Sequence, residues 1–341
     1  MAAESFRTLS LCMIVRDEES NIEGCLRSVQ GVVDEIVVVD TGSKDRTITI
    51  ARDFGALVVE EAWTNDFSAP RNRSIELATK DWILVLAADE RIAPASGRRM
   101  REVVGRTRAR GLQVRVRNLM PAGETALFDE VPQTRLFERR TEHRYEGIIH
   151  EQIAPSIVRG GGTIAKADLL VVHHGYQQDL VQGDRSRARR NLTLLEKQVE
   201  LTPRDPYVLY NLGCTYKAVG NLAAARGALE AAEANDHGAL DASSRLGLQT
   251  RLAQLALASR QDAIAVARAR KALAISPSNP VALQVVALGL VALGDRAGAL
   301  AAFAKLRRSP VVNPSLATDI DRLLARLAPA GPTARAAPLE R

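Results

Sequence analysis

The stretch WILVLAADERI, residues 82–92, begins with five apolar residues and turns acidic at Asp89 and Glu90. A short run that is apolar on both faces is typical of a strand buried inside a parallel sheet. Ligands of such sheets bind in the crevice beyond the carboxyl ends of the strands. Residues 82–86 are therefore predicted to form a central strand that delivers carboxylates to a ligand site.

Three further apolar runs precede this stretch, and each is followed by a helical pattern. Strands are predicted at 9–15, 35–40 and 56–59, and helices at 22–29, 45–54 and 70–79. The first helix shows the clearest period, because Ile22, Leu26 and Val29 recur at spacings of four and three. Alternating strands and helices predict an α/β domain whose parallel sheet is covered on both faces.

Acidic residues follow three of the four predicted strands. Asp17 and Glu18 come after the first strand, Asp40 ends the second, and Asp89 and Glu90 follow the fourth. No G-x-G-x-x-G follows the first strand and the chain has no P-loop motif, which disfavours a Rossmann dehydrogenase and a P-loop NTPase. Since an acidic crevice repels bare phosphates, a nucleotide bound there should carry a divalent cation.

The composition excludes several other classes of protein. The chain is 46% hydrophobic and 25% charged with a formal net charge of +6, and its arginines are scattered, so we expect no nucleic-acid partner. The basic run 185–190 fits a solvated helix face or a binding patch. There is no signal-like N-terminus and no apolar run of about 20 residues. The three cysteines are predicted to be free thiols, and the expected location is the cytoplasm.

The second half of the chain has the tetratricopeptide pattern. Pro206 and Gly220 recur, at one common offset, as Pro280 and Gly294, and a middle copy fits between them. Three helical hairpins of about 34 residues are predicted. The predicted organisation is a domain at 1–180, a connecting helix at 181–204, helical repeats at 205–327 and a disordered Pro/Ala-rich tail at 328–341. The repeats fit acceptor recognition, a homodimer contact or a structural buttress.

Several separated motifs carry a resemblance to a known family. They are LSLCMIVRDEESNIEGCLRSV (9–29), DEIVVVDTGSKDRT (34–47), DFSAPRNRSIELATKDWILVLAADE (66–90), RLFERRTEHRYEGIIHEQI (135–153) and LLVVHHGY (169–176). Their order and spacing resemble family 2 glycosyltransferases of the GT-A fold. The most similar branch has a tetratricopeptide tail and includes the S-glycosyltransferases of glycosylated bacteriocins.

The resemblance implies an enzyme that moves a sugar, with inversion, from a nucleotide-sugar such as a UDP-sugar to a peptide, protein or glycan acceptor. It implies donor-binding roles for Val15, Arg16, Asp17, Glu18, Asp40, Arg71 and Ala88. Asp40 would accept a hydrogen bond from the base, and Arg71 would meet the diphosphate. The alternatives are a turn-forming aspartate at 40 and an ordinary surface arginine at 71.

The resemblance also implies a metal site and a catalytic base. Asp89 matches the last aspartate of the family's Asp-x-Asp motif, so Asp89 and His173 are the predicted ligands of Mn²⁺ or Mg²⁺, with His174 ranked lower. Glu151 is the first candidate for the base that deprotonates the acceptor, and His150 is the second. The alternative is that both residues only hold the acceptor loop.

Ala87 departs from the family pattern, because it stands where the first aspartate of the motif is usual. The expected consequence is weaker donor or metal affinity. Two rival interpretations stay open: a transferase for cell-surface polysaccharide, and a degenerate, non-catalytic domain whose repeats act as a scaffold.

Overall fold

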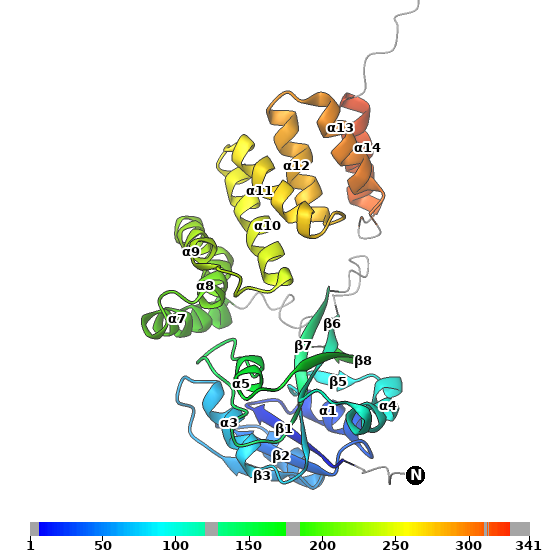
Figure 1. Ribbon diagram of the computed structural model, residues 1–341, viewed down its shortest axis with the longest axis vertical. Coiled ribbons are helices and arrows are strands. Elements are labelled where there is room, and N and C mark those ends of the chain that lie inside the picture. The colour runs from blue at the N-terminus through cyan, green and yellow to red at the C-terminus, as the bar shows by residue number, and fades with distance from the viewer. Residues whose placement is uncertain (1–6, 120–128, 175–184, 310–311, 313, 328–341) are drawn as a thin grey trace, which may run out of the picture. The chain divides into compact units, whose positions relative to one another are not determined.

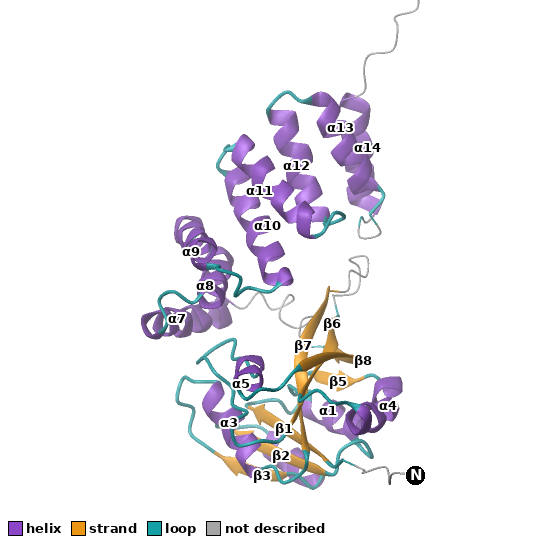
Figure 2. Ribbon diagram, in the orientation of Figure 1, coloured by secondary structure: helices purple, strands orange, loops and turns teal. Residues whose placement is uncertain are grey.

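The computed structural model describes residues 7–119, 129–174, 185–309, 312 and 314–327. These residues form two compact units, one ending at Leu201 and the other beginning at Thr202 (Figure 1). The first unit combines strands with helices, and the second is built from helices (Figure 2). The predicted disordered tail, 328–341, lies outside the described residues.

The strands of the first unit form one sheet in the order β3-β2-β1-β4-β7-β6-β8-β5. Their bounds are β1 Leu9–Val15, β2 Glu35–Asp40, β3 Leu57–Glu60, β4 Trp82–Val85, β5 Glu90–Ile92, β6 Gly111–Asn118, β7 Asp129–Glu138 and β8 Ile164–His173. β3, β2, β1 and β4 run parallel, and β7 then lies antiparallel between β4 and β6. β8 is parallel to β6, while β5 is antiparallel to β8.

The register places the predicted carboxylates at one edge of the sheet. Val15 at the end of β1 pairs with Asp40 at the end of β2, and β4 runs beside β1 in the same direction. The chain segments that follow β1, β2 and β4 therefore leave the sheet at the same side, as the sequence predicts.

Both faces of the sheet are covered, because alternate residues of the central strands enter different cores. Leu11 and Met13 pack in a cluster with side chains from α1 (Ile22–Val29), α2 (Thr47–Asp53) and α4 (Pro94–Arg106). Cys12, between them, packs in a cluster with side chains from α3 (Ser68–Leu77) and α5 (Ala154–Arg159). Such two-sided burial explains why these strands are continuously apolar.

Helix α3 begins two residues earlier than predicted. The carboxylate of Asp66 accepts from the N–H of Ser68 at 2.7 Å and of Ala69 at 3.3 Å, which satisfies backbone donors that the first turn of a helix leaves free. Pro70 therefore lies within the first turn, where its missing N–H costs little.

The second unit consists of paired helices. These are α8 Pro206–Ala218, α9 Leu222–Asn235, α10 Ala242–Ala258, α11 Asp262–Ile275, α12 Pro280–Ala292, α13 Arg296–Arg307 and α14 Pro314–Leu327. α8 packs on α9, α10 on α11 and α12 on α13, with α14 against α13. A Cβ on Gly213 would lie 2.6 Å from the side chain of Leu229, so the close contact of α8 with α9 requires glycine there. The predicted fold class, an α/β domain followed by helical repeats, is confirmed, and the predicted domain boundaries stay predictions.

None of the described helices has the length and apolar character that crossing a membrane requires. Cys12 and Cys25 are buried free thiols, as predicted, and Cys214 is a half-buried one.

Candidate functional site

The loops that follow β1 and β2 hold each other through backbone and side-chain groups. The N–H of Asp17 donates to Ser43 Oγ at 2.9 Å, and the N–H of Lys44 donates to Asp17 Oδ1 at 2.7 Å. The N–H of Glu18 donates to Thr47 Oγ1 at 2.7 Å. Asp17 also has a left-handed backbone, with φ of +53°. The loops after β1 and β2, both predicted to bind the donor, are therefore joined into one wall at the carboxyl edge of the sheet.

Asp40 is buried, and its carboxylate closes the turn that follows β2. Oδ1 accepts from the N–H of Gly42 and of Ser43, each at 2.8 Å, and Oδ2 is hydrogen-bonded to Ser43 Oγ. Gly42 has a φ of +109°, which favours glycine. The turn-forming alternative for Asp40 thus describes its contacts here, and its donor-binding role stays a prediction.

Three other predicted donor-binding residues lie close to this wall. The carbonyl of Val15 accepts from the backbone N–H of Thr41 at 2.9 Å and from its hydroxyl at 3.1 Å. Arg16 is half exposed, with Nε 3.7 Å from Asp17 Oδ2. Ala88 is buried directly before Asp89. Neither Val15 nor Ala88 has a polar side chain, and the Val15 carbonyl is already occupied by Thr41, so the donor-binding roles of both residues stay predictions.

The two predicted metal ligands lie together, although 84 positions separate them in the sequence. His173 Nε2 lies 3.1 Å from Asp89 Oδ2, and His173 Nδ1 lies 2.8 Å from Asn118 Oδ1. Burial raises the pKa of Asp89, but the hydrogen bond and charge of His173 outweigh it and leave that pKa lowered. The same hydrogen bond raises the pKa of His173 despite its partial burial. His174 lies beside the pair and donates its backbone N–H to the Asp89 carbonyl at 2.9 Å.

This pair fits a cation that a ligand brings with it. Within the described ranges, no group of three or more His, Cys, Asp or Glu side chains is placed to hold a metal ion. Mg²⁺ usually takes one or two protein ligands and completes its shell with phosphate oxygens and water. One carboxylate and one imidazole, fixed by Asn118 behind it, are consistent with that arrangement.

Glu90 has a structural partner that the sequence reasoning missed. It is buried, its Oε2 accepts from the Ala87 N–H at 2.9 Å, and its Oε1 accepts from Arg135 Nη2 at 2.5 Å. The Nε of Arg135 is buried and has no hydrogen-bond partner. A buried glutamate requires a cationic partner, but only the pairing of β7 with β4 brings Arg135 close to it.

Arg71 and Glu151, predicted for different roles, form an ion pair with each other. Arg71 Nε and Glu151 Oε1 are in direct contact, and only 15% and 11% of the two side chains are exposed. The Arg71 guanidinium also lies 5.4 Å from the ring centre of Tyr145. Burial lowers the pKa of Arg71, but the charge and hydrogen bond of Glu151, together with Tyr145 and Glu90, leave that pKa raised. His150, in contrast, is exposed and has a left-handed backbone with φ of +52°.

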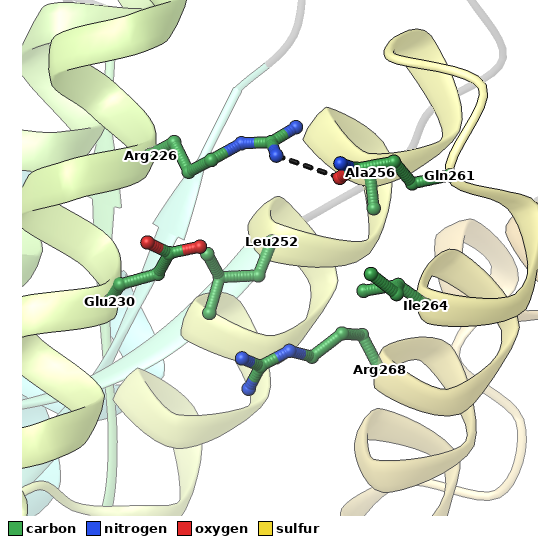
Figure 3. Close-up of a pocket in the computed structure, with 7 residues that line it drawn as sticks. All are labelled: Arg226, Glu230, Leu252, Ala256, Gln261, Ile264 and Arg268. Carbon is green, nitrogen blue, oxygen red and sulfur yellow. Dashed lines mark hydrogen bonds between the residues drawn. The ribbon is translucent and has the colours of Figure 1, made fainter.

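The repeat unit contains a separate cavity of about 250 Å³, between α9, α10 and α11. Arg226 and Arg268 lie on its two sides and Leu252 lies between them (Figure 3). Arg226 Nη1 donates to Gln261 Oε1 at 2.7 Å, and Arg268 is ion-paired with Glu233. The cavity therefore combines an apolar wall with two arginines and the carboxylate of Glu230.

The candidate donor and metal residues lie at the carboxyl edge of the parallel strands, which is where open α/β sheets bind their ligands. Residues 10–152 match the family model described as Glycosyl transferase family 2.

Two relatives are named as a repeat-containing protein and as a glycosyltransferase. A TPR repeat-containing protein of Synechococcus elongatus is 37% identical over 227 residues, which are 64% of this chain and 54% of that protein. The glycosyltransferase SunS of Bacillus subtilis is 28% identical over 208 residues, which are 60% of this chain and 48% of SunS. The matched part thus spans about half the length of each relative. The predicted family and branch are confirmed.

Solved structures show more distant similarity. Glucosyl-3-phosphoglycerate synthase of Mycobacterium tuberculosis, in complex with Mn²⁺, UDP and glucosyl-3-phosphoglycerate, has a TM-score of 0.39 and 19% identity, covering 58% of this chain and 82% of that one. The S. aureus TarS structure has a TM-score of 0.40 and 12% identity, covering 88% and 90%.

Proposed function

We propose that this protein is an inverting glycosyltransferase that moves a sugar from a UDP-sugar to a peptide or protein acceptor. The observation that supports it most directly is the 3.1 Å approach of His173 Nε2 to Asp89 Oδ2 beyond the end of β4. Long-range packing brings together one carboxylate and one imidazole where the family domain would need its cation. The similarity to SunS supports a glycosyltransferase, and the resemblance of the sequence motifs to the bacteriocin S-glycosyltransferase branch favours a peptide or protein acceptor over a glycan.

The donor would lie on the wall formed by the loops after β1 and β2. In this proposal Val15, Arg16, Asp17, Glu18 and Asp40 contact the nucleoside, and the backbone at Ala88 borders the ribose. Asp89 and His173 would hold Mn²⁺ or Mg²⁺, which neutralises charge on the diphosphate when bound. His173 must then give up its bond to Asp89, so metal binding competes with that hydrogen bond.

The acceptor would be deprotonated by Glu151, with His150 as the alternative base. As it stands, the Arg71 guanidinium is in direct contact with Glu151 Oε1, so the carboxylate already has a partner. A diphosphate oxygen is a strong partner for a guanidinium. Donor binding would therefore draw Arg71 towards the diphosphate and leave Glu151 able to accept the acceptor's proton.

The repeats would recognise the acceptor. The cavity beside Arg226, Glu230 and Arg268 offers an apolar wall and charges of both signs, which suit a peptide segment with apolar and charged side chains. The homodimer contact predicted for the repeats is an alternative use of the same unit. The non-catalytic scaffold is the rival function, and Ala87 is the observation that favours it.

A donor-binding and turnover experiment tests the proposal. UDP is titrated into the full chain with and without Mn²⁺, and hydrolysis of a panel of UDP-sugars is then measured without acceptor. We expect cation-dependent binding and slow hydrolysis of at least one donor, both lost in Asp89→Asn. Absence of binding and of hydrolysis with every donor would establish the scaffold interpretation instead.

A further inference from the structure

Helix α7, Arg185–Leu201, follows the family domain, and one of its faces packs on the unit that contains the candidate site. Leu194 and Leu195 are buried, and Gln198, one turn further on, is only 6% exposed. Arg190, one turn before Leu194, places its guanidinium 5.7 Å from the ring centre of Phe67. Residues 190, 194 and 198 share one helix face because they are spaced by four. The sequence predicts for this segment only a helix that connects the two domains.

The buried glutamine of this face is bonded to the segment that carries the candidate base. Gln198 Oε1 accepts from the backbone N–H of Ile148 at 2.7 Å. The carbonyl of Ile148 accepts from the N–H of Phe67 at 2.9 Å, so both backbone polar groups of Ile148 are hydrogen-bonded. A buried peptide N–H that loses its acceptor is left unsatisfied, so removal of this contact should destabilise the segment locally.

The segment 145–152 is a closed loop whose geometry depends on such anchors. Glu146 and Gln152 exchange two backbone hydrogen bonds of 3.0 Å at its base. Gly147 and His150 have left-handed backbones, with φ of +92° and +52°. A left-handed backbone at a residue other than glycine is costly and persists only where surrounding contacts impose it. Of the two polar groups of Ile148, one is held by α7 and the other by the N–H of Phe67, the residue before α3.

We propose that Gln198 is a positioning residue of the transferase site, which holds the 145–152 loop, and with it His150 and Glu151, through the peptide N–H of Ile148. This inference rests on the proposed function, because it assigns the base to that loop. Gln198 touches no reacting group, so it acts only through the loop. Helix α7 is then a wall of the transferase site, and the family domain needs it for turnover.

Two substitutions distinguish the effect of the acceptor oxygen of Gln198 from the effect of its side-chain size. Gln198→Met keeps the length but removes the acceptor, whereas Gln198→Glu keeps an oxygen for the Ile148 N–H. The matched control is Gln249→Met, since Gln249 is another buried glutamine, whose side chain donates to Glu233 Oε1 at 2.9 Å within the repeats.

Hydrogen–deuterium exchange of the full chain provides a readout that does not depend on activity. We expect Gln198→Met to speed exchange of the Ile148 amide at least tenfold while β2 keeps its protection. Gln198→Glu and Gln249→Met should leave the loop as in the unchanged chain. Unchanged exchange at Ile148 in Gln198→Met would overturn the proposal. So would equal loosening of the loop and β2, because Gln198 would then support the whole unit.

UDP-sugar hydrolysis provides the functional readout. We expect kcat of Gln198→Met to fall about tenfold with KM for the donor unchanged, because only the base is misplaced. Gln198→Glu should restore most of kcat. A rise in KM alone would contradict a role in positioning the base. If the unchanged chain hydrolyses no UDP-sugar, the proposed function fails, while the exchange result still decides whether Gln198 holds the loop.

Discussion

Asp40 ends β2 and Asp89 follows β4, so both lie at the carboxyl edge of the parallel strands, yet the two carboxylates have different partners. The Asp40 carboxylate is surrounded by donors of its own turn, two backbone N–H groups and the Ser43 hydroxyl. The Asp89 carboxylate contacts the imidazole of His173, a side chain from the far end of the domain. A carboxylate that backbone donors satisfy maintains a loop, whereas one held by a single titratable side chain can exchange that partner for a cation.

The largest effect should follow removal of the Asp40 carboxylate. Asp40→Ala deletes three hydrogen bonds to an ionised group, and we expect the free energy of unfolding of the first unit to fall by about 3 kcal/mol. Urea denaturation followed by a probe in that unit measures it. Asp53→Ala, at an exposed aspartate that ends α2, is the control and should change stability by less than about 0.5 kcal/mol. A loss below about 1 kcal/mol at position 40 would show that the turn does not depend on this carboxylate.

In contrast to Asp40→Ala, Asp89→Asn should reduce turnover strongly and change stability little. The asparagine keeps a hydrogen-bond partner for His173 but loses the charge that a divalent cation requires, so stability should change by less than about 1 kcal/mol. We expect Mn²⁺-dependent hydrolysis of the UDP-sugar to fall about 100-fold, equivalent to about 2.7 kcal/mol in the activation free energy. Rates measured against Mn²⁺ concentration test this. Intact turnover in Asp89→Asn would place the metal ligand elsewhere and remove the contrast with Asp40.

The sequence predicted this fold well because its signals are local. Continuous apolar runs such as 35–40 identify buried parallel strands, and helical spacing from Ile22 to Val29 identifies what covers them. Both patterns need only neighbouring residues. The strand-end rule then predicts which edge of the sheet carries the site, without knowledge of the strand order.

The partners within the site could not be predicted in the same way. Asn118 behind His173, and Arg135 beside Glu90, reach their places through β6 and β7, whose pairing is set by long-range packing. The contact of Arg71 with Glu151 joins residues 80 positions apart. No periodic pattern encodes such contacts, so the sequence could propose these residues but not which of them meet.

Asp45 is a third carboxylate, in the loop that follows β2, and its contribution to stability should depend on pH. Asp45 Oδ2 accepts from the N–H of Glu19 at 3.0 Å, and Oδ1 accepts from that of Thr47 at 2.9 Å. Burial raises the pKa of Asp45, but the hydrogen bonds from Thr47 and from these N–H groups outweigh it, so the pKa is lowered. A lowered folded-state pKa contributes stability that is present above the unfolded value, near 3.9, and is lost as the pH falls below it.

Asp45→Asn should therefore remove a small, pH-dependent part of the stability. We expect a loss of about 1 kcal/mol at pH 7 that narrows as the pH falls below about 4, because Asp45 of the unchanged chain then becomes protonated and loses its advantage over the neutral asparagine. Thermal unfolding between pH 3 and pH 7 measures the difference. A constant difference across that range would mean that the hydrogen bonds do not depend on the charge of Asp45.

Ala87→Asp should have the smallest effect and addresses the departure from the family pattern. The new carboxylate adds negative charge next to the candidate cation site, so we expect the affinity for Mn²⁺ with UDP to rise about threefold, or about 0.7 kcal/mol. The gain is limited because Asp89 and Glu90 already bear like charges close by, and because the Ala87 N–H is engaged by Glu90. Ala87→Ser, which adds a polar atom without charge, is the control for calorimetric titration. Equal affinities of the aspartate and serine variants would mean that position 87 does not face the cation, and that Ala87 cannot account for a weakened site.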